Sequence, residues 1–238
     1  MVFTPLWDHS PFKWPTTPYV MWSLVVINFV VYFIQAVGTP DQLEHVDHVA
    51  GLIPVALTHG GVPGALPAPL TLITSMFLHA NFLHVFGNML FLFVFGDDIE
   101  EVLGHWRFLA FYLACGIGAG LTFVLNDPSS TTELIGASGA VAGVIAAYLL
   151  FRPCAKMWCL LGIIPLHIRA YWVIGSWAIL QVVEVSTQEQ DGVAYWAHVG
   201  GLIIGAILFI VMRPACVRLL DCAQPDTMLP AADGEPPR

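Results

Sequence analysis

The chain has 238 residues, of which 57% are hydrophobic and 11% are charged, and its formal net charge is −9. A soluble globular domain carries about 25% charged residues, so this chain lacks the charged side chains that would cover a water-exposed surface. The same composition excludes a disordered chain, a collagen and a disulfide-stapled secreted scaffold, and the negative charge argues against nucleic-acid binding. The composition therefore predicts a membrane protein.

Apolar stretches recur along the chain at lengths close to that of a helix crossing the roughly 30 Å hydrocarbon core of a bilayer. In chain order, the six predicted spans are residues 19–37, 71–96, 108–126, 134–151, 170–183 and 192–212. The fifth is the shortest, because Arg169 and Glu184 leave only fourteen uncharged residues between them. As a helix, each stretch would carry apolar residues on every face, which is typical of helices in lipid. The sequence thus predicts an all-α, polytopic membrane protein with six transmembrane helices.

The basic residues predict the orientation of these spans. All eight Lys and Arg residues fall on one side of the six-span arrangement, whereas the loops on the other side contain acidic residues and no basic ones. Basic residues are enriched in cytoplasmic loops, so both termini are predicted to be cytoplasmic. We expect a short cytoplasmic N-terminal segment (1–18), a six-span domain (19–213) and a disordered cytoplasmic tail (214–238). No cysteine lies in an outer loop, so all five are expected to be free thiols.

Four polar residues lie inside or at the start of spans, where such groups are costly and mark candidate functional sites. His84 and Asn88 lie four residues apart on one face of the second span. Ser138 lies near the start of the fourth span within Gly-Ala-Ser-Gly-Ala, and His198 near the start of the sixth within Ala-His-Val-Gly-Gly. The direction of each span places all four residues at a similar depth, slightly below the outer surface.

A serine and a histidine at one depth suggest a nucleophile and its general base, and His84 with Asn88 could donate hydrogen bonds to an oxyanion. Taken singly, Ser138 is more often a helix-packing residue and His198 a hydrogen-bonded packing histidine. A metal site using His79 and His84 is disfavoured, because residues five apart diverge by about 140° on a helix. Asn88 is also a poor zinc ligand. The joint pattern favours catalysis.

Small residues in the fourth and sixth spans predict how these polar groups could meet. Gly139 and Gly143 lie in the fourth span, and Gly201 and Gly205 lie in the sixth, each pair four residues apart. Such pairs let two membrane helices approach closely. We therefore expect direct packing of the fourth span on the sixth.

Four motifs, in this order, resemble those of the rhomboid family of intramembrane serine proteases. They are His-Ala-Asn-Phe-Leu-His-Val-Phe-Gly-Asn at 79–88, Glu100 and Gly104 followed by 107–113, Gly-Ala-Ser-Gly at 136–139, and Ala-His-Val-Gly-Gly-Leu at 197–202. The resemblance covers residues 71–212. Each motif is short and unspecific by itself, but the ordered set on six spans is specific to the family.

The resemblance implies a Ser138–His198 dyad without a third acid, with the oxyanion held by His84, Asn88 and the N–H of Ser138. It implies no metal, no cofactor and no nucleotide. The substrates it implies are membrane proteins whose transmembrane helix is cut near the outer membrane face. The six-span core looks like the prokaryotic type, which implies the inner or plasma membrane of a bacterium. The competing interpretation is a catalytically inactive rhomboid-like protein that binds transmembrane clients.

Two features depart from the family pattern. Some relatives carry an aromatic residue one turn after the nucleophile, stacking on the histidine, whereas this chain has Ala142. Some also carry a Trp-Arg pair in the first outer loop, whereas residues 38–70 contain no arginine. His79 and Glu100 match family positions that we expect to be structural, with Glu100 satisfying backbone groups.

Overall fold

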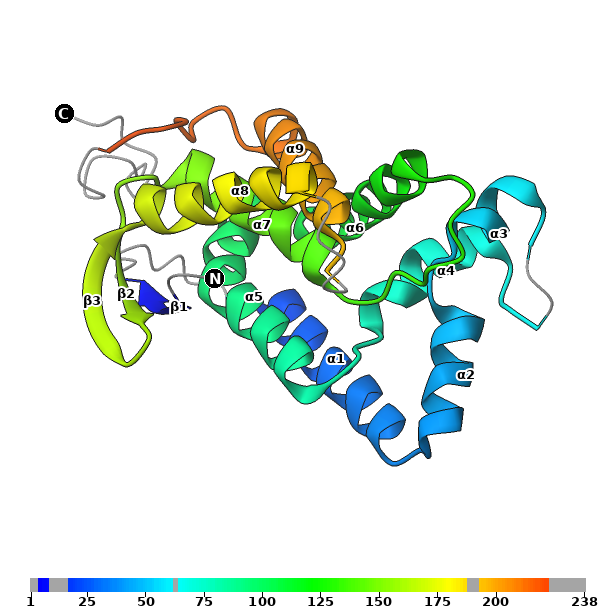
Figure 1. The fold of residues 1–238 in the computed structure, drawn as a ribbon. Coiled ribbons are helices and arrows are strands. Elements are labelled where there is room, and N and C mark those ends of the chain that lie inside the picture. The colour runs from blue at the N-terminus through cyan, green and yellow to red at the C-terminus, as the bar shows by residue number, and fades with distance from the viewer. Residues whose placement is uncertain (1–3, 9–16, 62–63, 188–192, 223–238) are drawn as a thin grey trace.

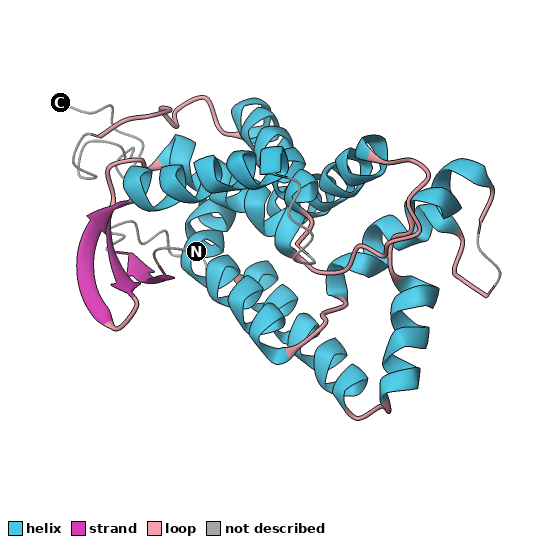
Figure 2. Cartoon of the chain, in the orientation of Figure 1, coloured by secondary structure: helices cyan, strands magenta, loops and turns pink. Residues whose placement is uncertain are grey.

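The structure, a computed structural model, describes residues 4–8, 17–61, 64–187 and 193–222 and is mostly helical, with a small sheet at one end (Figures 1 and 2). The helices are α1 Tyr19–Ala36, α2 Pro40–Ala50, α3 Pro54–His59, α4 Ala68–Thr74, α5 Phe82–Leu103, α6 His105–Asn126, α7 Ser138–Phe151, α8 Ala170–Thr187 and α9 Tyr195–Met212. A 3-10 turn spans Ser75–Phe77, and the strands are β1 Thr4–Asp8, β2 Lys156–Leu161 and β3 Ile164–Arg169.

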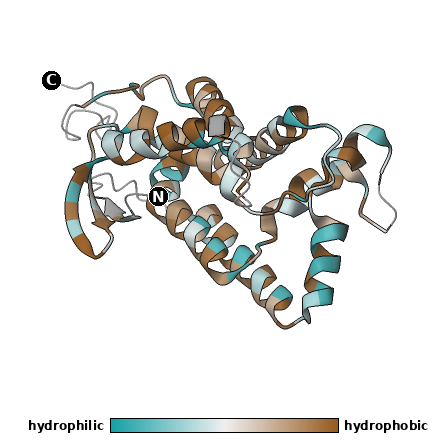
Figure 3. Ribbon diagram, in the orientation of Figure 1, coloured by the Kyte–Doolittle hydropathy of each residue, from teal (hydrophilic) through white to brown (hydrophobic). Residues whose placement is uncertain are grey.

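The apolar helices identify a membrane protein, as predicted. Within the described residues, α1, α5, α6 and α9 are long and apolar enough to cross a membrane. The apolar helix α7, with 14 residues, and the apolar part of α8 are both shorter than these four helices. Each of the six predicted spans overlaps one of these helices, but only four of these helices are long enough to cross a membrane. Figure 3 shows that α2, outside this set, is the most hydrophilic helix.

The prediction of one continuous second span over 71–96 is wrong. The structure has α4 and the 3-10 turn first, and α5 begins only at Phe82. Asn81 caps α5, because its Oδ1 accepts the backbone N–H of His84 (2.9 Å) and so satisfies one of the unpaired groups at the helix start. At its other end α5 runs past the predicted boundary to Leu103, and there Asp98 forms an ion pair with Arg152 (2.9 Å).

Buried Glu100 joins three helices near the end of α5. Its carboxylate accepts the backbone N–H groups of Val20 (2.9 Å) and Met21 (2.6 Å), which are unpaired within the first turn of α1. The Nδ1 of His105, the first residue of α6, also contacts this carboxylate (2.5 Å). The expectation that Glu100 satisfies backbone groups is therefore confirmed.

A three-stranded antiparallel sheet, in the order β1-β2-β3, makes the all-α prediction incomplete. The apolar stretch between α7 and α8 folds as the β2–β3 hairpin, and β1 from the predicted separate N-terminal segment pairs with β2. Burial alternates along β2, where Met157 and Cys159 are buried while Lys156 and Trp158 are exposed. This period of two is typical of a strand with one covered face.

The prediction of five free thiols is wrong for one pair. Cys154 and Cys222 form a disulfide, with Cα atoms 5.2 Å apart, and they lie 68 positions apart in sequence. They meet because the chain after α9 returns to α7, where the N–H of Leu220 donates to the carbonyl oxygen of Leu150 (2.7 Å). Residues 214–222 of the expected disordered tail are thus packed on the bundle, and 223–238 lie outside the described residues. The free cysteines are Cys115, Cys159 and Cys216.

Almost wholly buried, α7 lies in the middle of the bundle and packs against α5, α6, α8 and α9 (Figure 1). The predicted close approach of α7 and α9 is confirmed. A Cβ atom on Gly201 would overlap the carbonyl oxygen of Gly139, and one on Gly205 would overlap the backbone of Gly143. The carbonyl oxygen of Gly201 would lie 3.3 Å from a Cβ on Gly143. These glycines therefore set the spacing of the two helices.

Substituting Gly205→Ala is expected to destabilise the protein by about 1–3 kcal/mol, because the added methyl group forces two packed backbones apart. Gly175→Ala is the matched control, since a Cβ there meets no atom within 4 Å. Thermal unfolding in detergent micelles measures both variants. Equal melting temperatures for the two variants would contradict the packing argument.

Candidate active site

Ser138 is the first residue of α7, and the segment before it is held on both sides. Leu134 pairs with Leu52, in the segment between α1 and α4, through two backbone hydrogen bonds (3.0 and 2.8 Å). The N–H of Gly136 donates to the carbonyl oxygen of Ser75 (2.8 Å), and Gly136 adopts φ +116°. A Cβ at this position would lie 2.7 Å from the ring of His84, so glycine is required by both backbone conformation and space.

His79 fixes the last residue before Ser138. Its Nε2 accepts the N–H of Ala137 (3.4 Å), and its own backbone N–H donates to Oε1 of Gln35 on α1 (3.3 Å). The side chain is fully buried. His79 therefore links α1 to the turn that begins α7, in agreement with the structural role expected for it.

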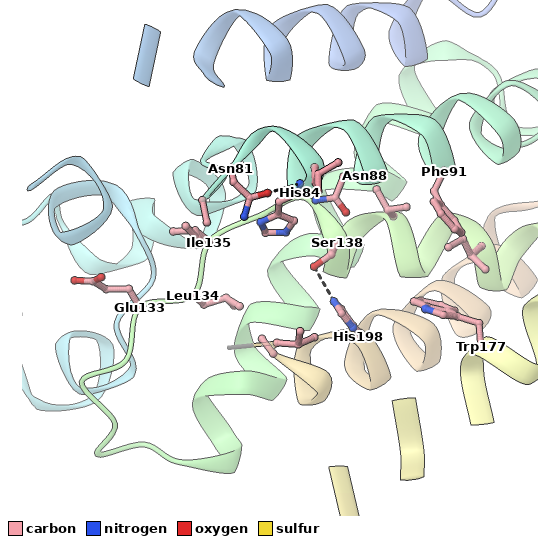
Figure 4. Close-up of a pocket in the computed structure, with 17 residues that line it drawn as sticks. Asn81, His84, Asn88, Phe91, Glu133, Leu134, Ile135, Ser138, Trp177 and His198 are labelled. Carbon is pink, nitrogen blue, oxygen red and sulfur yellow. Dashed lines mark hydrogen bonds between the residues drawn. The ribbon is translucent and has the colours of Figure 1, made fainter. Parts of the chain in front are cut away.

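Ser138 and His198 are in direct contact across the α7–α9 interface. The Oγ of Ser138 lies 2.8 Å from Nε2 of His198, within hydrogen-bond distance, as Figure 4 shows. His198 lies in the first turn of α9, so both residues lie at the same end of two neighbouring helices. A serine hydroxyl bonded to an imidazole nitrogen is the arrangement in which the imidazole can take the hydroxyl proton.

His84 and Asn88 lie one turn apart on α5 and point toward Ser138 from the opposite side of the same pocket (Figure 4). The Nδ2 of Asn88 is buried and makes no hydrogen bond to the described part of the chain. An unpaired buried donor costs free energy unless a ligand or water satisfies it. Asn88 is therefore available to donate to a group bound beside Ser138.

The cavity around these side chains has a volume of about 700 Å³ and is lined mainly by α5, α7, α8, α9 and the segment before Ser138. Its apolar wall includes Phe91, Val141, Ile145, Trp177 and Val193. A mostly apolar cleft with a few convergent polar groups is typical of a ligand site. Within the described residues, no group of three or more His, Cys, Asp or Glu side chains could hold a metal ion.

An acidic residue lies at the side of the pocket that faces α2. Glu133 lines the pocket and contacts Nδ1 of His48 on α2 (3.2 Å). Partial burial, and then the nearby Glu133 carboxylate, raise the pKa of Asp47 above its ordinary value. The segment between α1 and α4, which lacks the Trp-Arg pair, thus packs on the residues leading to Ser138 through α2 and Leu52.

Sequence reasoning missed the residues that hold His198. Gln181 on α8 lies with its Oε1 2.6 Å from Nδ1 of His198. Two aromatic rings also contact the imidazole, that of Trp177 on α8 at 6.0 Å and that of Tyr195 on α9 at 6.3 Å between ring centroids. These contacts take the place of the aromatic residue that is absent at Ala142. The signal for Gln181 was a polar amide inside the apolar fifth span.

A family model described as the Rhomboid domain matches residues 68–215 of the chain. The chain is 27% identical over 201 residues to "Rhomboid-like protein 11, chloroplastic" of Arabidopsis thaliana and 28% identical over 211 residues to "Rhomboid protease AarA" of Providencia stuartii. It is 31% identical over 165 residues to "Rhomboid-type serine protease 2" of Emericella nidulans.

These matches cover 79%, 79% and 65% of this chain, respectively. They cover 63%, 70% and 30% of the three relatives. The residues matched by the family model include His84, Asn88, Ser138 and His198. The relatives carry further sequence outside the regions that match this chain.

Proposed function

The chain belongs to the rhomboid family, and from that premise we propose that it is an intramembrane serine endopeptidase. In this proposal it cleaves transmembrane segments of membrane proteins near the outer membrane face. The observation that carries the proposal is the 2.8 Å contact between Ser138 Oγ and His198 Nε2, in a pocket that also holds the unpaired donor of Asn88.

The proposed reaction begins when Ser138 Oγ attacks the carbonyl carbon of the scissile peptide bond while His198 Nε2 takes the hydroxyl proton. The tetrahedral intermediate collapses as the imidazolium returns this proton to the leaving amine, and the new amino terminus departs. A water molecule then attacks the acyl-enzyme ester, again giving its proton to His198. The second collapse releases the new carboxyl terminus and restores Ser138.

The oxyanion of each tetrahedral intermediate is proposed to accept hydrogen bonds from His84, Asn88 and the backbone N–H of Ser138. The two side chains face Ser138 across the pocket (Figure 4). The N–H of Ser138 belongs to the first turn of α7, where backbone donors are unpaired within the helix and the helix dipole is positive. Such preorganised donors stabilise charge that develops only during the reaction. This chemistry requires side chains and water only, without a metal or a cofactor.

The helix directions support a site at the outer membrane face. Ser138 begins α7 and Arg152 follows its end, while His198 lies near the start of α9 and Arg213 follows its end. Basic residues are enriched on the cytoplasmic side, so the pocket lies at the opposite ends of these helices. We accordingly propose residues 19–213 as the protease domain, a location in a bacterial plasma membrane and cytoplasmic termini.

The proposed substrates are single transmembrane helices with weak helix formers near their outer end. A helix conceals its scissile bonds in its own hydrogen-bond ladder, so local unwinding must precede attack. The apolar wall of the pocket suits side chains from such a segment. The same surface would suit an inactive protein that only binds transmembrane clients, and an experiment must separate these two functions.

The test is co-reconstitution of the protein in liposomes with a single-span substrate that carries Gly and Ala near its outer end. The unmodified protein is expected to cut the substrate into two fragments, with the new termini inside or beside the transmembrane segment, whereas Ser138→Ala leaves it intact. Ser176→Ala is the control, because the Ser176 hydroxyl donates a hydrogen bond to the Val173 carbonyl oxygen of its own helix (3.1 Å) and does not line the pocket. An intact substrate that co-purifies with the unmodified protein would instead support the client-binding function.

A further inference from the structure

Gln181 is a polar side chain of α8 that contacts the proposed catalytic base. It is buried, with 6% of its surface exposed, although its neighbours Val182 and Val183 on the same helix are exposed. Its Oε1 lies 2.6 Å from Nδ1 of His198, on the other side of the imidazole from the contact with Ser138. Hydrogen bonds to an imidazole restrict both its orientation and the position of its proton.

The orientation of the Gln181 amide follows from its second contact. Its Nε2 donates to the backbone carbonyl oxygen of Trp177, one turn earlier on α8 (3.4 Å). A carbonyl oxygen can only accept, so the amide nitrogen must face Trp177 and the amide oxygen must face His198. The His198 nitrogen that faces this oxygen must then carry a hydrogen.

The position of this hydrogen decides which nitrogen of His198 can act on Ser138. With Nδ1 donating to Gln181, the neutral imidazole has its lone pair on Nε2, the atom that lies 2.8 Å from Ser138 Oγ. The opposite tautomer would present an N–H to the serine and could not accept its proton.

We propose that Gln181 is a positioning residue that holds His198 in the tautomer and orientation needed to accept the Ser138 proton. The serine and its base then work as part of a Ser138–His198–Gln181 chain, with an amide in the third position. This inference rests on the proposed function, and it extends the dyad implied by the family resemblance with a residue of this chain. When His198 becomes charged, the amide dipole stabilises the imidazolium through the same hydrogen bond.

Side chains from four helices surround His198. His84 faces it from α5 and Ser138 from α7, while the rings of Trp177 on α8 and Tyr195 on α9 contact it. The aromatic rings can restrict the tilt of the imidazole, whereas the Gln181 amide oxygen accepts a hydrogen bond from its Nδ1. Because the acceptor lies on α8 and the base on α9, the base is oriented only while these two helices remain packed together.

The experiment compares Gln181→Leu, Gln181→Glu and the control Ser176→Ala in proteoliposomes, measuring kcat, KM and the pH profile of cleavage. Leucine fills similar space but cannot accept a hydrogen bond. We expect Gln181→Leu to lower kcat by about 10- to 100-fold with KM little changed, because a hydrogen bond to a charged group is lost in the transition state. Ser176→Ala should have the same kcat as the unmodified protein.

Gln181→Glu restores an acceptor and is expected to recover most of the kcat lost in Gln181→Leu. A carboxylate stabilises the charged imidazolium more strongly than an amide does, and only the neutral imidazole can act as the base. The acidic limb of the kcat/KM profile should therefore move to higher pH in Gln181→Glu. A purely structural role for Gln181 would lower the melting temperature and leave this limb in place.

Two results separate this inference from the proposed function. If the unmodified protein cuts the substrate and Gln181→Leu cuts it at the same kcat, Gln181 does not position the base, and the protease function stands. The same conclusion follows if Gln181→Glu folds and its acidic limb does not move. If the unmodified protein cuts no substrate and none of its serines reacts with a fluorophosphonate probe, the proposed function fails, and this inference fails with it.

Discussion

Substituting either Ser138→Ala or His198→Ala is expected to lower kcat/KM for a membrane-embedded substrate by about 10⁴-fold or more, in effect abolishing cleavage. Ser138 supplies the atom that forms the acyl bond, and His198 is the group placed to take its proton, at 2.8 Å. Since the two act as one unit, the double variant should be no slower than either single variant. Cleavage in proteoliposomes measures all three.

Folding of these variants is checked by their melting temperatures. Ser138 and His198 are half-buried and face the pocket, so truncating them should change stability less than Gly205→Ala does. Cleavage by the His198→Ala variant at a rate near that of the unmodified protein would contradict the assignment of the base. Additive losses in the double variant would show that the two residues act independently.

Truncating the proposed oxyanion donors should produce the next largest effect. Asn88→Ala and His84→Ala are each expected to lower kcat by about 10²- to 10³-fold, with KM little changed, because their donors act mainly on charge that appears in the transition state. The Nδ2 of Asn88 lacks a hydrogen-bond partner in the described residues, so truncation removes a free donor and breaks no recorded bond. Initial-rate kinetics over a range of substrate concentrations separate kcat from KM.

Asn28→Ala is the matched control for Asn88→Ala. Asn28 is also a buried asparagine of an apolar helix, but its Nδ2 donates to Leu24 within α1 (2.8 Å), and it does not line the pocket. The Asn28→Ala variant should be less stable than the unmodified protein and should have the same kcat. If Asn88→Ala matched Asn28→Ala in kcat, Asn88 would not be an oxyanion donor.

The meeting of His84, Asn88, Ser138 and His198 could be predicted because the signal is local to each span. A polar group in an apolar helix is costly, and the direction of each span gives its depth. The close packing of α7 on α9 could be predicted for a similar reason, since Gly139 and Gly205 each lie in a recognisable small-residue pair. The structure places all four polar residues around one cavity.

Other features depend on contacts between residues far apart in the chain. The break before α5 was hidden because residues 71–96 contain no charged residue that would divide them, and the bond by which Asn81 caps α5 forms only in the folded turn. The β2–β3 hairpin was obscured because its residues are nearly all apolar, and its third strand comes from the other end of the chain. Cys154 and Cys222 meet only through the return of the chain to α7. Gln181 lies in the fifth predicted span, and its contact with His198 depends on how α8 packs against α9.

The central claim, that Ser138 is a nucleophile activated by His198, is tested most directly by reacting the purified protein in lipid with a fluorophosphonate probe. Mass spectrometry of the digested protein then locates the adduct, without requiring a known substrate. We expect one adduct, on Ser138, that is absent from the Ser138→Ala and His198→Ala variants. No adduct on the unmodified protein, or an adduct that persists on another serine in Ser138→Ala, would contradict the claim.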